Sequence, residues 1–509
     1  MMHDPEKSDP PIVASKPVNA IARAGAEPGE RRGGAEGNAD QHGMCRTPSR
    51  VSRSSGLERV RTAAGQGKKD RFTALLHHVT ADLLRDAYSW LKRDAAAGVD
   101  GVTWDEYGTD LEANLADLHA RIHRGAYRAQ PSRRTYIPKP DGRRRPLGIA
   151  ALEDKIVQRA LTDVLNAIYE ADFLGFSYGF RPGRSQHDAL DALAVGIESR
   201  RVNWILDADI AGFFDTVSHD WLIRFVEHRV GDRRVIRLIR KWLKAGVLED
   251  GKVETAEVGT PQGAVISPLL ANIYLHYVFD LWAERWRRRE ARGDVIIVRY
   301  ADDIVVGFQH RHEAERFLDE LTRRLAAFAL QLHPDKTRLI EFGRHAAANR
   351  KKRGLGKPEP FDFLGFTHIC GRSRKGGFVL RRQSRRDRLR AKLREIKENL
   401  RLNRHAPIEE QGSWLRHVMT GYFAYHAVPT NGPSLNLFRR AVAWMWRRAL
   451  RRRGQRDKTS WNTINRLAER WLPRPRILHP WPSQRFTVKH PRWEPDAGMP
   501  LVRFCAGGA

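Results

Sequence analysis

Two adjacent aspartates, Asp302 and Asp303, lie between two apolar runs rich in β-branched residues, 295–298 and 304–306. Such runs predict two strands joined by a tight turn, with both acids at the tip of the hairpin. Neighbouring carboxylates repel each other, and a bound divalent cation removes that cost. The pair therefore indicates a metal site, although a plain polar hairpin turn would have the same sequence.

A second pair of acids, Asp207 and Asp209, alternates with apolar residues in segment 204–210. The strand period of two places both on one face, where acids among apolar neighbours need a partner; a solvated edge strand is the alternative. Together, Asp209 and Asp302 would hold two Mg²⁺ ions about 3.5–4 Å apart, which activate a hydroxyl and stabilise leaving pyrophosphate. Polymerases and nucleases both use this chemistry, and spacing does not separate them.

The elements that must position these acids alternate between strand-like and helix-like segments from about residue 133 to 370. Residues 135–138 read as a short strand and residues 152–169 as a helix. Short strands mixed with helices favour an α+β domain over a helical bundle. The Gly-, Ala-, Arg- and Ser-rich residues 1–68 are expected to form a basic, disordered leader.

The character of the chain changes after about residue 380. Leu389, Leu393, Ile396 and Leu400 recur at helical spacing among arginines, and a second basic helical region covers residues 438–453. We therefore expect four parts: a leader, an α+β domain, a helical domain and an irregular tail, over residues 1–68, 69–375, 376–480 and 481–509.

The charge balance is strongly basic. Lys and Arg total 90 against 60 Asp and Glu in 509 residues, a formal net charge of +30. This balance indicates a polyanionic partner, most plausibly nucleic acid, although a generally basic proteome would give the same balance. No apolar run approaches the roughly 20 residues that span a bilayer. The three cysteines are far apart, which excludes a disulfide framework or a multi-cysteine zinc site and fits a reducing cytoplasm.

Eight segments, in order, resemble the sequence blocks of bacterial group II intron reverse transcriptase/maturases. The match covers roughly residues 71–480, and eight ordered blocks are far more specific than a lone YxDD. The blocks are residues 98–102 (GVDGV), 136–149 (YIPKPDGR and RPLGI), 177–185 (SYGFRPGRS), 209–215 (DIAGFFD), 259–269 (GTPQG and SPL), 300–303 (YADD), 332–337 (LHPDKT) and 363–366 (FLGF).

The resemblance implies an RNA-directed DNA polymerase with a right-hand fold, in which fingers and palm precede an α-helical thumb and maturase domain. Asp209, Asp302 and Asp303 would form the catalytic acidic triad, with Asp209 and Asp302 the main Mg²⁺ ligands. The Ile210 carbonyl would join the coordination of the two ions. Asp207 falls outside the triad as a supporting or structural acid.

Three basic residues are implied at the nucleotide. Lys139 and Arg145 would contact the incoming triphosphate through charge-assisted bonds. Lys336 would donate a proton to the leaving pyrophosphate. A solvated hairpin or surface position is the structural alternative for Lys139 and Lys336.

The remaining implied contacts surround the sugar, the base and the template. Phe214 would be a steric gate against the ribose 2′-hydroxyl, or else a core aromatic. Gln262 and Gly263 would line the template and nucleotide pocket, with glycine allowing close backbone approach. Arg181 and Arg184 would contact the template backbone, unless they are ordinary surface arginines.

The helical region resembles the maturase part of the family, on residues 421–425 (GYFAY) and 446–453 (WRRALRRR). It would grip intron RNA through phosphates and shape, with Arg388, Arg447 and Arg448 as contacts. Of Trp444 and Trp446 we expect at least one to be buried. The tail is too short for the zinc-bearing endonuclease of many relatives, so that domain is expected to be absent.

These observations favour an intron-encoded protein of the bacterial cytoplasm, associated with the nucleoid when it acts on DNA. Its partners would be group II intron RNA, an RNA template, a DNA primer or target and deoxynucleoside triphosphates, without a membrane; the sequence does not give the oligomeric state. Two alternatives stay open. One is a related reverse transcriptase of a retron, defence or diversity-generating system, and the other is a maturase that assists splicing without polymerising.

Overall fold

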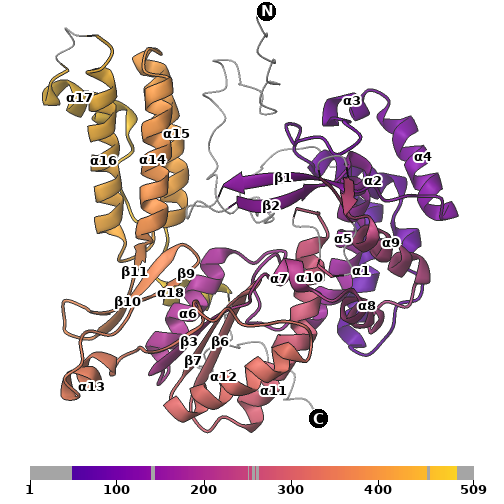
Figure 1. Ribbon diagram of the computed structural model, residues 1–509, viewed down its shortest axis with the longest axis horizontal. Helices are drawn as coiled ribbons and strands as arrows, with labels where there is room; N and C mark the ends of the chain where they lie inside the picture. Colours follow the sequence, from indigo (N-terminus) through magenta and orange to yellow (C-terminus); the bar gives the residue numbers. More distant parts are fainter. Residues whose placement is uncertain are drawn as a thin grey trace, which may run out of the picture. The chain divides into compact units, whose positions relative to one another are not determined.

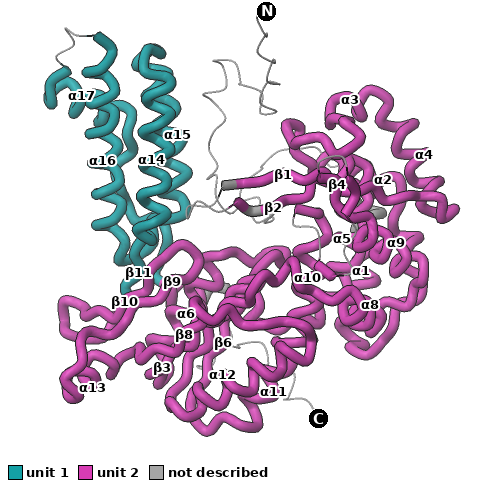
Figure 2. Tube along the Cα trace, in the orientation of Figure 1, with its two compact units in different colours: residues 1–30, 381–481 teal, residues 31–380, 482–509 magenta. Residues whose placement is uncertain are grey.

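The structure is a computed structural model that describes residues 49–138, 144–249, 252–254, 258–259, 263–454 and 459–489. Its described residues form two compact units (Figure 2). Unit 1 covers residues 381–481, and unit 2 covers the described residues up to 380 together with 482–489. The acidic residues singled out above all belong to unit 2.

The first part of unit 2 is helical, with one long buried helix, α5, against which α1 and α2 pack. Thirteen of the 21 residues of α5 are buried, so it forms the spine of this part of the core. The helices are α1 (Ser49–Gln66), η2 (Leu76–His78), α2 (Ala81–Trp90), α3 (Trp104–Gly108), α4 (Leu111–Arg124), α5 (Leu152–Asp172), α8 (His219–Glu227) and α9 (Arg233–Lys244).

A four-stranded sheet has the order β2-β1-β4-β5, and its strands β1 and β2 extend from beside these helices (Figure 1). Its strands are β1 (Ser132–Pro138), β2 (Arg144–Ile149), β4 (Val247–Glu249) and β5 (Lys252–Glu254). β1 and β2 form an antiparallel hairpin in which Thr135 is opposite Leu147. The predicted strand at 135–138 is therefore confirmed.

A second four-stranded sheet has the order β6-β7-β3-β8 and carries the acidic residues. All residues of β6 are buried, because α6 packs on β6 while α12 packs on β3 and β7. The strands are β3 (Trp204–Asp209), β6 (Val295–Tyr300), β7 (Asp303–Phe308) and β8 (Arg338–Glu341), and the helices around them are α6 (Gln186–Ser199), α7 (Phe213–Thr216), α10 (Ser267–Leu275), η3 (His276–Asp280), α11 (Leu281–Arg289) and α12 (Arg311–Ala326). Mixed helix and sheet confirm the expected α+β class of this unit.

The chain leaves the second sheet through a short helix and three strands. They are α13 (Ala346–Lys352), β9 (Phe361–Phe363), β10 (Phe366–Arg372) and β11 (Phe378–Ser384). β9 and β10 form an antiparallel hairpin in which Phe363 is opposite Phe366. The residues of β11 are divided between the two units.

Two sequence expectations are corrected by the described residues. Part of the expected disordered leader is helix α1, in which Val60 and Ala64 are buried against the core. Part of the expected irregular tail is helix α18 (Pro482–Lys489), which packs on α6 and buries Phe486. Both segments carry few apolar residues among many polar ones, so their patterns are weak, but the few apolar side chains are covered by tertiary packing. Residues 1–48 and 490–509 lie outside the described residues.

Unit 1 is a helical unit built on α14 (Arg386–Leu402), α15 (Ile408–His426), α16 (Gly432–Leu450) and α17 (Trp461–Trp471). Its core joins apolar side chains of all four helices. Trp446 is fully buried and its indole N–H donates to Gln411 Oε1 at 2.9 Å. Trp444 is 47% exposed, so the prediction that at least one of the two tryptophans is buried is confirmed.

None of the helices in the described ranges is long and apolar enough to cross a membrane.

Candidate active site

The adjacent aspartates lie where predicted, at the tip of the β6–β7 hairpin. Tyr300 and Asp303 are directly opposite each other in the antiparallel register, so Ala301 and Asp302 form the turn. Ala301 has a φ of 56°, a left-handed conformation that is uncommon for a residue with a side chain. The turn is therefore tight, and it presents two consecutive carboxylates at one end of the sheet.

The neighbouring strand β3 brings a third acid to the same end. Asp209 is opposite Asp303, and Asp207 is opposite Val305. Directly opposed residues of antiparallel strands share a face, with Cβ atoms about 4.5–5.5 Å apart. The register therefore places Asp209 opposite Asp303, with Asp207 on the same face of β3 two residues before Asp209. Asp302 directly precedes Asp303 and lies in the turn.

Two basic side chains, Lys336 and Arg338, form ion pairs with these aspartates. Lys336 Nζ lies 2.7 Å from Asp209 Oδ2, and the lysine side chain is 54% exposed. Arg338 lies 3.5 Å from Asp207. The pKa of Asp207 is raised to about 6, mainly by burial and further by Asp303 and Asp209, against the opposing effect of Arg338. The negative charge of these acids is therefore only partly balanced by the two basic side chains.

The strand end that carries Asp209 is held from the other side by the segment that carries Lys336. The His333 amide donates to the Asp209 carbonyl at 2.7 Å, and Ile210 pairs with Leu332 in an isolated antiparallel bridge. Ile210 itself is buried. These backbone bonds explain why a lysine far along the sequence from Asp209 reaches its carboxylate.

Within the described part of the chain, no three His, Cys, Asp or Glu side chains are grouped closely enough to hold a metal ion by themselves. Mg²⁺ does not need such a cage, because it binds through one or two carboxylates together with water and substrate phosphates. The facing pair Asp209 and Asp303, with Asp302 beside them, supplies the hard oxygen donors that this ion prefers.

The aromatic pair after β3 follows a left-handed glycine. Gly212, with a φ of 52°, is the N-cap of α7. Phe213 is buried in the core, whereas Phe214 is only partly buried and meets the Phe213 ring edge-on at 5.3 Å. Phe214 thus keeps exposed surface close in sequence to Asp209, which the steric-gate assignment requires.

Gly263, the last residue of the GTPQG sequence, packs closely against β2. Gly263 has a φ of 110°, and a Cβ atom there would lie 2.6 Å from the Gly148 carbonyl oxygen. No side chain fits at this close backbone approach. Lys139 and Gln262 lie outside the described residues, as does the side chain of Arg145.

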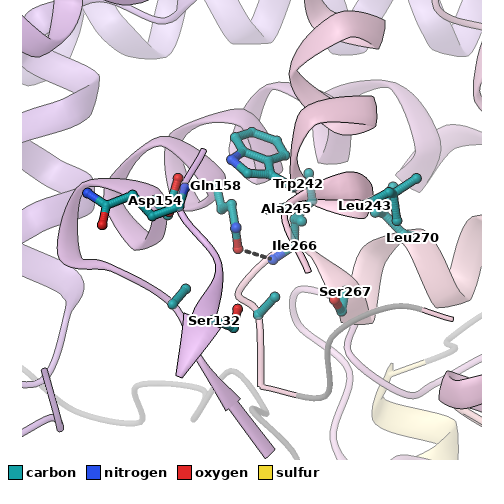
Figure 3. Close-up of a pocket in the computed structure, with 12 residues that line it drawn as sticks. Ser132, Asp154, Gln158, Trp242, Leu243, Ala245, Ile266, Ser267 and Leu270 are labelled. Atoms are coloured by element: carbon teal, nitrogen blue, oxygen red, sulfur yellow. Dashed lines mark hydrogen bonds between the residues drawn. The ribbon is translucent and has the colours of Figure 1, made fainter. Parts of the chain in front are cut away.

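Two polar residues of α5, Asp154 and Gln158, hold the segments on either side of a small cavity (Figure 3). Gln158 Oε1 accepts the amide of Val265 at 2.9 Å, two residues after Gly263, and Asp154 accepts the amide of Gln130 at 3.0 Å, before β1. The cavity measures about 10 Å³, room for about one water molecule. It is far too small for a nucleotide, so these residues position the neighbouring segments.

Sequence reasoning missed Asp154 and Gln158. The available signal was two polar residues one turn apart on the apolar face of a predicted helix, since buried polar groups require partners.

Comparison with known proteins gives the family of the chain. Residues 137–368, which include the acidic site, match the family model described as reverse transcriptase (RNA-dependent DNA polymerase). The chain is 36% identical to Protein YkfC of Escherichia coli over 311 residues, 55% of this chain and 77% of that protein. It is 37% identical over 222 residues to the group II intron-encoded protein LtrA of Lactococcus lactis, 43% of this chain and 37% of LtrA.

The chain belongs to the group II intron reverse transcriptase/maturase family. It is a reverse transcriptase, an RNA-directed DNA polymerase that acts on nucleic acid and nucleotides. Nuclear intron maturase 4 of Arabidopsis thaliana is 25% identical over half of this chain. The chain spans 31% of that protein and 37% of LtrA.

One predicted template contact of this reverse transcriptase is corrected. The Arg181 side chain is 3% exposed and forms an ion pair with Glu170 at 3.0 Å. Its Nη1 donates to the carbonyls of Leu174 and Ser177, both at 2.7 Å. Arg181 therefore stabilises its own loop, because Nε, Nη1 and Nη2 all donate to groups within the protein and the side chain is buried. Arg184, which is partly exposed and donates to the Gly175 carbonyl at 2.7 Å, remains a candidate.

The predicted maturase contacts lie on the helices of unit 1. Arg448 is exposed and its guanidinium lies 5.4 Å from the centre of the exposed Trp444 ring. Arg447 is partly exposed and lies 4.5 Å from the centre of the Trp461 ring, itself 47% exposed. Paired arginine and tryptophan side chains suit phosphate contact and base stacking. Arg388, on α14, is partly exposed.

Proposed function

We propose that this reverse transcriptase is an intron-encoded protein that copies RNA into DNA with two Mg²⁺ ions at Asp209, Asp302 and Asp303. The observation that carries the proposal is the register that faces Asp209 with Asp303 beside the Asp302 turn. It would also bind group II intron RNA to assist splicing and support intron mobility by reverse transcription at a DNA target. LtrA, which is named as a group II intron-encoded protein, supports this second part.

In this proposal Asp209 and Asp302 are the main ligands of the ions, joined by Asp303 and the Ile210 carbonyl. Bound Mg²⁺ would lower the pKa of the primer 3′-hydroxyl and neutralise charge on the leaving pyrophosphate. Lys336 would move its ammonium group from Asp209 to the triphosphate, where it donates a proton to the leaving group. The 2.7 Å contact supports this role, because it keeps Lys336 at the acids before substrate arrives.

Substrate selection would come from the residues around the acids. Phe214 would occupy the space of a ribose 2′-hydroxyl, so that deoxynucleotides are preferred. Gly263 would let the template and nucleotide approach the backbone, with Gln262, Lys139 and Arg145 as further contacts. The partial burial of Phe214 supports its role, whereas the close packing of Gly263 on the Gly148 carbonyl accounts for glycine at that position by itself.

The two compact units are consistent with a right-hand polymerase. Unit 2 would supply fingers and palm, for which we keep the predicted range 69–375, and unit 1 the helical thumb and maturase domain, predicted at 376–480. The arginine and tryptophan pairs of unit 1 would contact intron RNA, with Arg388 and Arg184 as further RNA contacts.

The test separates polymerisation from splicing. Asp302→Ala in the full chain should abolish extension of a DNA primer on an RNA template, while intron splicing by the same protein stays largely intact. Asp319→Ala, at an exposed position on α12, is the matched control and should leave both activities unchanged. Extension by Asp302→Ala at the normal rate would refute the active site. A wild-type protein that extends primers but never stimulates intron splicing would refute the maturase role.

A further inference from the structure

Arg299 is a charged residue near the end of an otherwise apolar strand. It lies on β6, three residues before Asp302, and its side chain is fully buried. A buried guanidinium is tolerated only when charge and hydrogen-bond partners surround it. The identity of those partners shows what this arginine does.

The Arg299 side chain makes five hydrogen bonds. Nε and Nη2 donate to the two carboxylate oxygens of Asp280 at 2.7 and 2.6 Å. Nη2 also donates to Ser177 Oγ at 2.6 Å, and Nη1 donates to Asn272 Oδ1 at 3.0 Å. The fifth bond, from Nη1 to the Ala301 carbonyl at 3.0 Å, reaches the turn that carries Asp302.

The bond to the Ala301 carbonyl holds the residue of the hairpin turn that has a left-handed backbone conformation. Ala301 has the left-handed φ of 56°, and such a conformation persists only where surrounding contacts enforce it. The turn also lies against Gly179, where a Cβ atom would be 2.3 Å from the Ala301 nitrogen. The Gly179 carbonyl accepts a bond from Asn272 Nδ2 at 2.6 Å, so the same asparagine contacts both the arginine and the loop behind the turn.

The backbone of Arg299 is tied to that loop as well. Its amide donates to the Phe176 carbonyl at 2.9 Å, and its carbonyl accepts the Tyr178 amide at 2.9 Å. The arginine is therefore fixed at both main chain and side chain, and one of its side-chain bonds extends to the turn.

The acid that pairs with Arg299 is presented by an unusual helix segment. Asp280 is fully buried and ends the π-helical turn η3, which interrupts the helix between α10 and α11. π-Helical turns are rare and are found frequently at functional sites. This one carries the Asp280 carboxylate, and both of its oxygens accept hydrogen bonds from Arg299 on β6 of the acidic hairpin.

We propose that Arg299, held by Asp280, is a positioning residue that sets the Ala301–Asp302 turn and so the place of Asp302 and Asp303 relative to Asp209. This inference rests on the proposed function of those acids. It assigns the buried pair a part in the rate of the reaction and in the use of Mg²⁺, beyond its contribution to the stability of the core.

The chain contains a matched control for a purely structural role. Arg229 is likewise buried, lies 3.1 Å from Asp172 through Nε, and donates to the carbonyls of Gly67 and Ala64 at 2.8 and 3.3 Å. These partners belong to the helical part of unit 2 and not to the hairpin. Arg229→Lys therefore reports the cost of weakening a buried arginine pair without touching the acids.

The experiment compares Arg299→Lys, Asp280→Asn and Arg229→Lys in the full chain. Primer extension on an RNA template gives kcat, the KM for deoxynucleotides and the Mg²⁺ concentration for half-maximal rate; thermal unfolding gives Tm. Lysine cannot make the five bonds of Arg299, so kcat should fall roughly 10- to 100-fold and the half-maximal Mg²⁺ concentration should rise, with KM unchanged. Asp280→Asn keeps the side-chain volume and should shift both quantities in the same direction, to a smaller extent.

The control should lose Tm like Arg299→Lys but keep the wild-type kcat and Mg²⁺ dependence. A variant of Arg299 or Asp280 that is folded and retains both wild-type values overturns the proposal, as does a fall in kcat that merely follows Tm in all three variants. If Arg299→Lys does not fold, Asp280→Asn decides alone. Wild type and Asp302→Ala are run in parallel, because extension by Asp302→Ala refutes the proposed function instead.

Discussion

Replacing Gly179 by alanine would put a methyl group against the backbone of the turn that carries Asp302. The new Cβ atom would lie 2.3 Å from the Ala301 nitrogen and 3.1 Å from its Cα atom. Both are main-chain atoms, so no side-chain rotation can relieve the contact. Either the loop with Gly179 or the hairpin turn has to move.

The size of that movement follows from the distances. Ordinary van der Waals contacts begin at 3.4 Å, so the turn or the loop has to retreat by about 1 Å. The loop is held by the bond from Asn272 to the Gly179 carbonyl, and we expect the turn to give way. Misplacing reacting groups by about 1 Å can cost roughly 100-fold in rate, and we predict a loss of kcat of that order for Gly179→Ala.

Primer extension on an RNA template measures this loss, together with Tm and the affinity for the primer–template. Gly196→Ala is the matched control, because the three atoms nearest to its Cβ atom all belong to the side chain of Ile296 on β6, the closest at 2.8 Å. The control should lose stability but keep most of its kcat. A Gly179→Ala protein that is folded, binds primer–template and extends it at the wild-type rate would refute the reasoning that the turn sets the rate.

Three further predictions concern the nucleotide, the core and the RNA surface. Phe214→Ala should lower the preference for deoxynucleotides over ribonucleotides by roughly 10- to 100-fold, measured as the ratio of kcat/KM values; an unchanged ratio would contradict the steric gate. Burial raises the pKa of Asp154 to about 6, so the folded protein holds this proton more tightly than the unfolded chain, and stability from this group is lost as the pH rises towards 6. Between pH 5 and 7 wild type should therefore lose about 1 kcal/mol relative to Asp154→Asn in denaturant unfolding, and parallel curves for the two proteins would disprove the shift. Binding of intron RNA should weaken steeply with salt, and Arg448→Ala should reduce the slope of log Kd against log salt by about one; a flat salt response would argue against a phosphate-binding surface.

The sequence predicts the acidic hairpin and the strand beside it because their apolar patterns are strong and local. The β-branched runs around Asp302 give two strands of period two. The pairing of β7 with β3, and the register that places Asp209 opposite Asp303, join segments far apart in the sequence and are seen only in the structure. The change to basic helices after about residue 380 is likewise visible as a 3.6-residue apolar period, and unit 1 begins at residue 381.

Other features depend on partners far away in the sequence. The family resemblance predicts that Arg181 contacts the template backbone, yet Glu170 and two carbonyls hold it in the interior. Arg299 was not singled out, although a charge inside an apolar strand needs a partner. That partner, Asp280, is supplied by a π-helical turn that no local pattern predicts.

The central claim is that Asp209, Asp302 and Asp303 hold the metal ions of the polymerase. Anomalous diffraction from a crystal of the full chain with RNA template, DNA primer, an incoming deoxynucleotide and Mn²⁺ in place of Mg²⁺ tests it most directly. The account predicts two anomalous peaks at the end of β3 and the β6–β7 turn, with Asp209 and Asp302 as ligands and Lys336 moved from Asp209 to the triphosphate. Peaks elsewhere, with Lys336 still paired to Asp209 beside a bound nucleotide, would contradict the account.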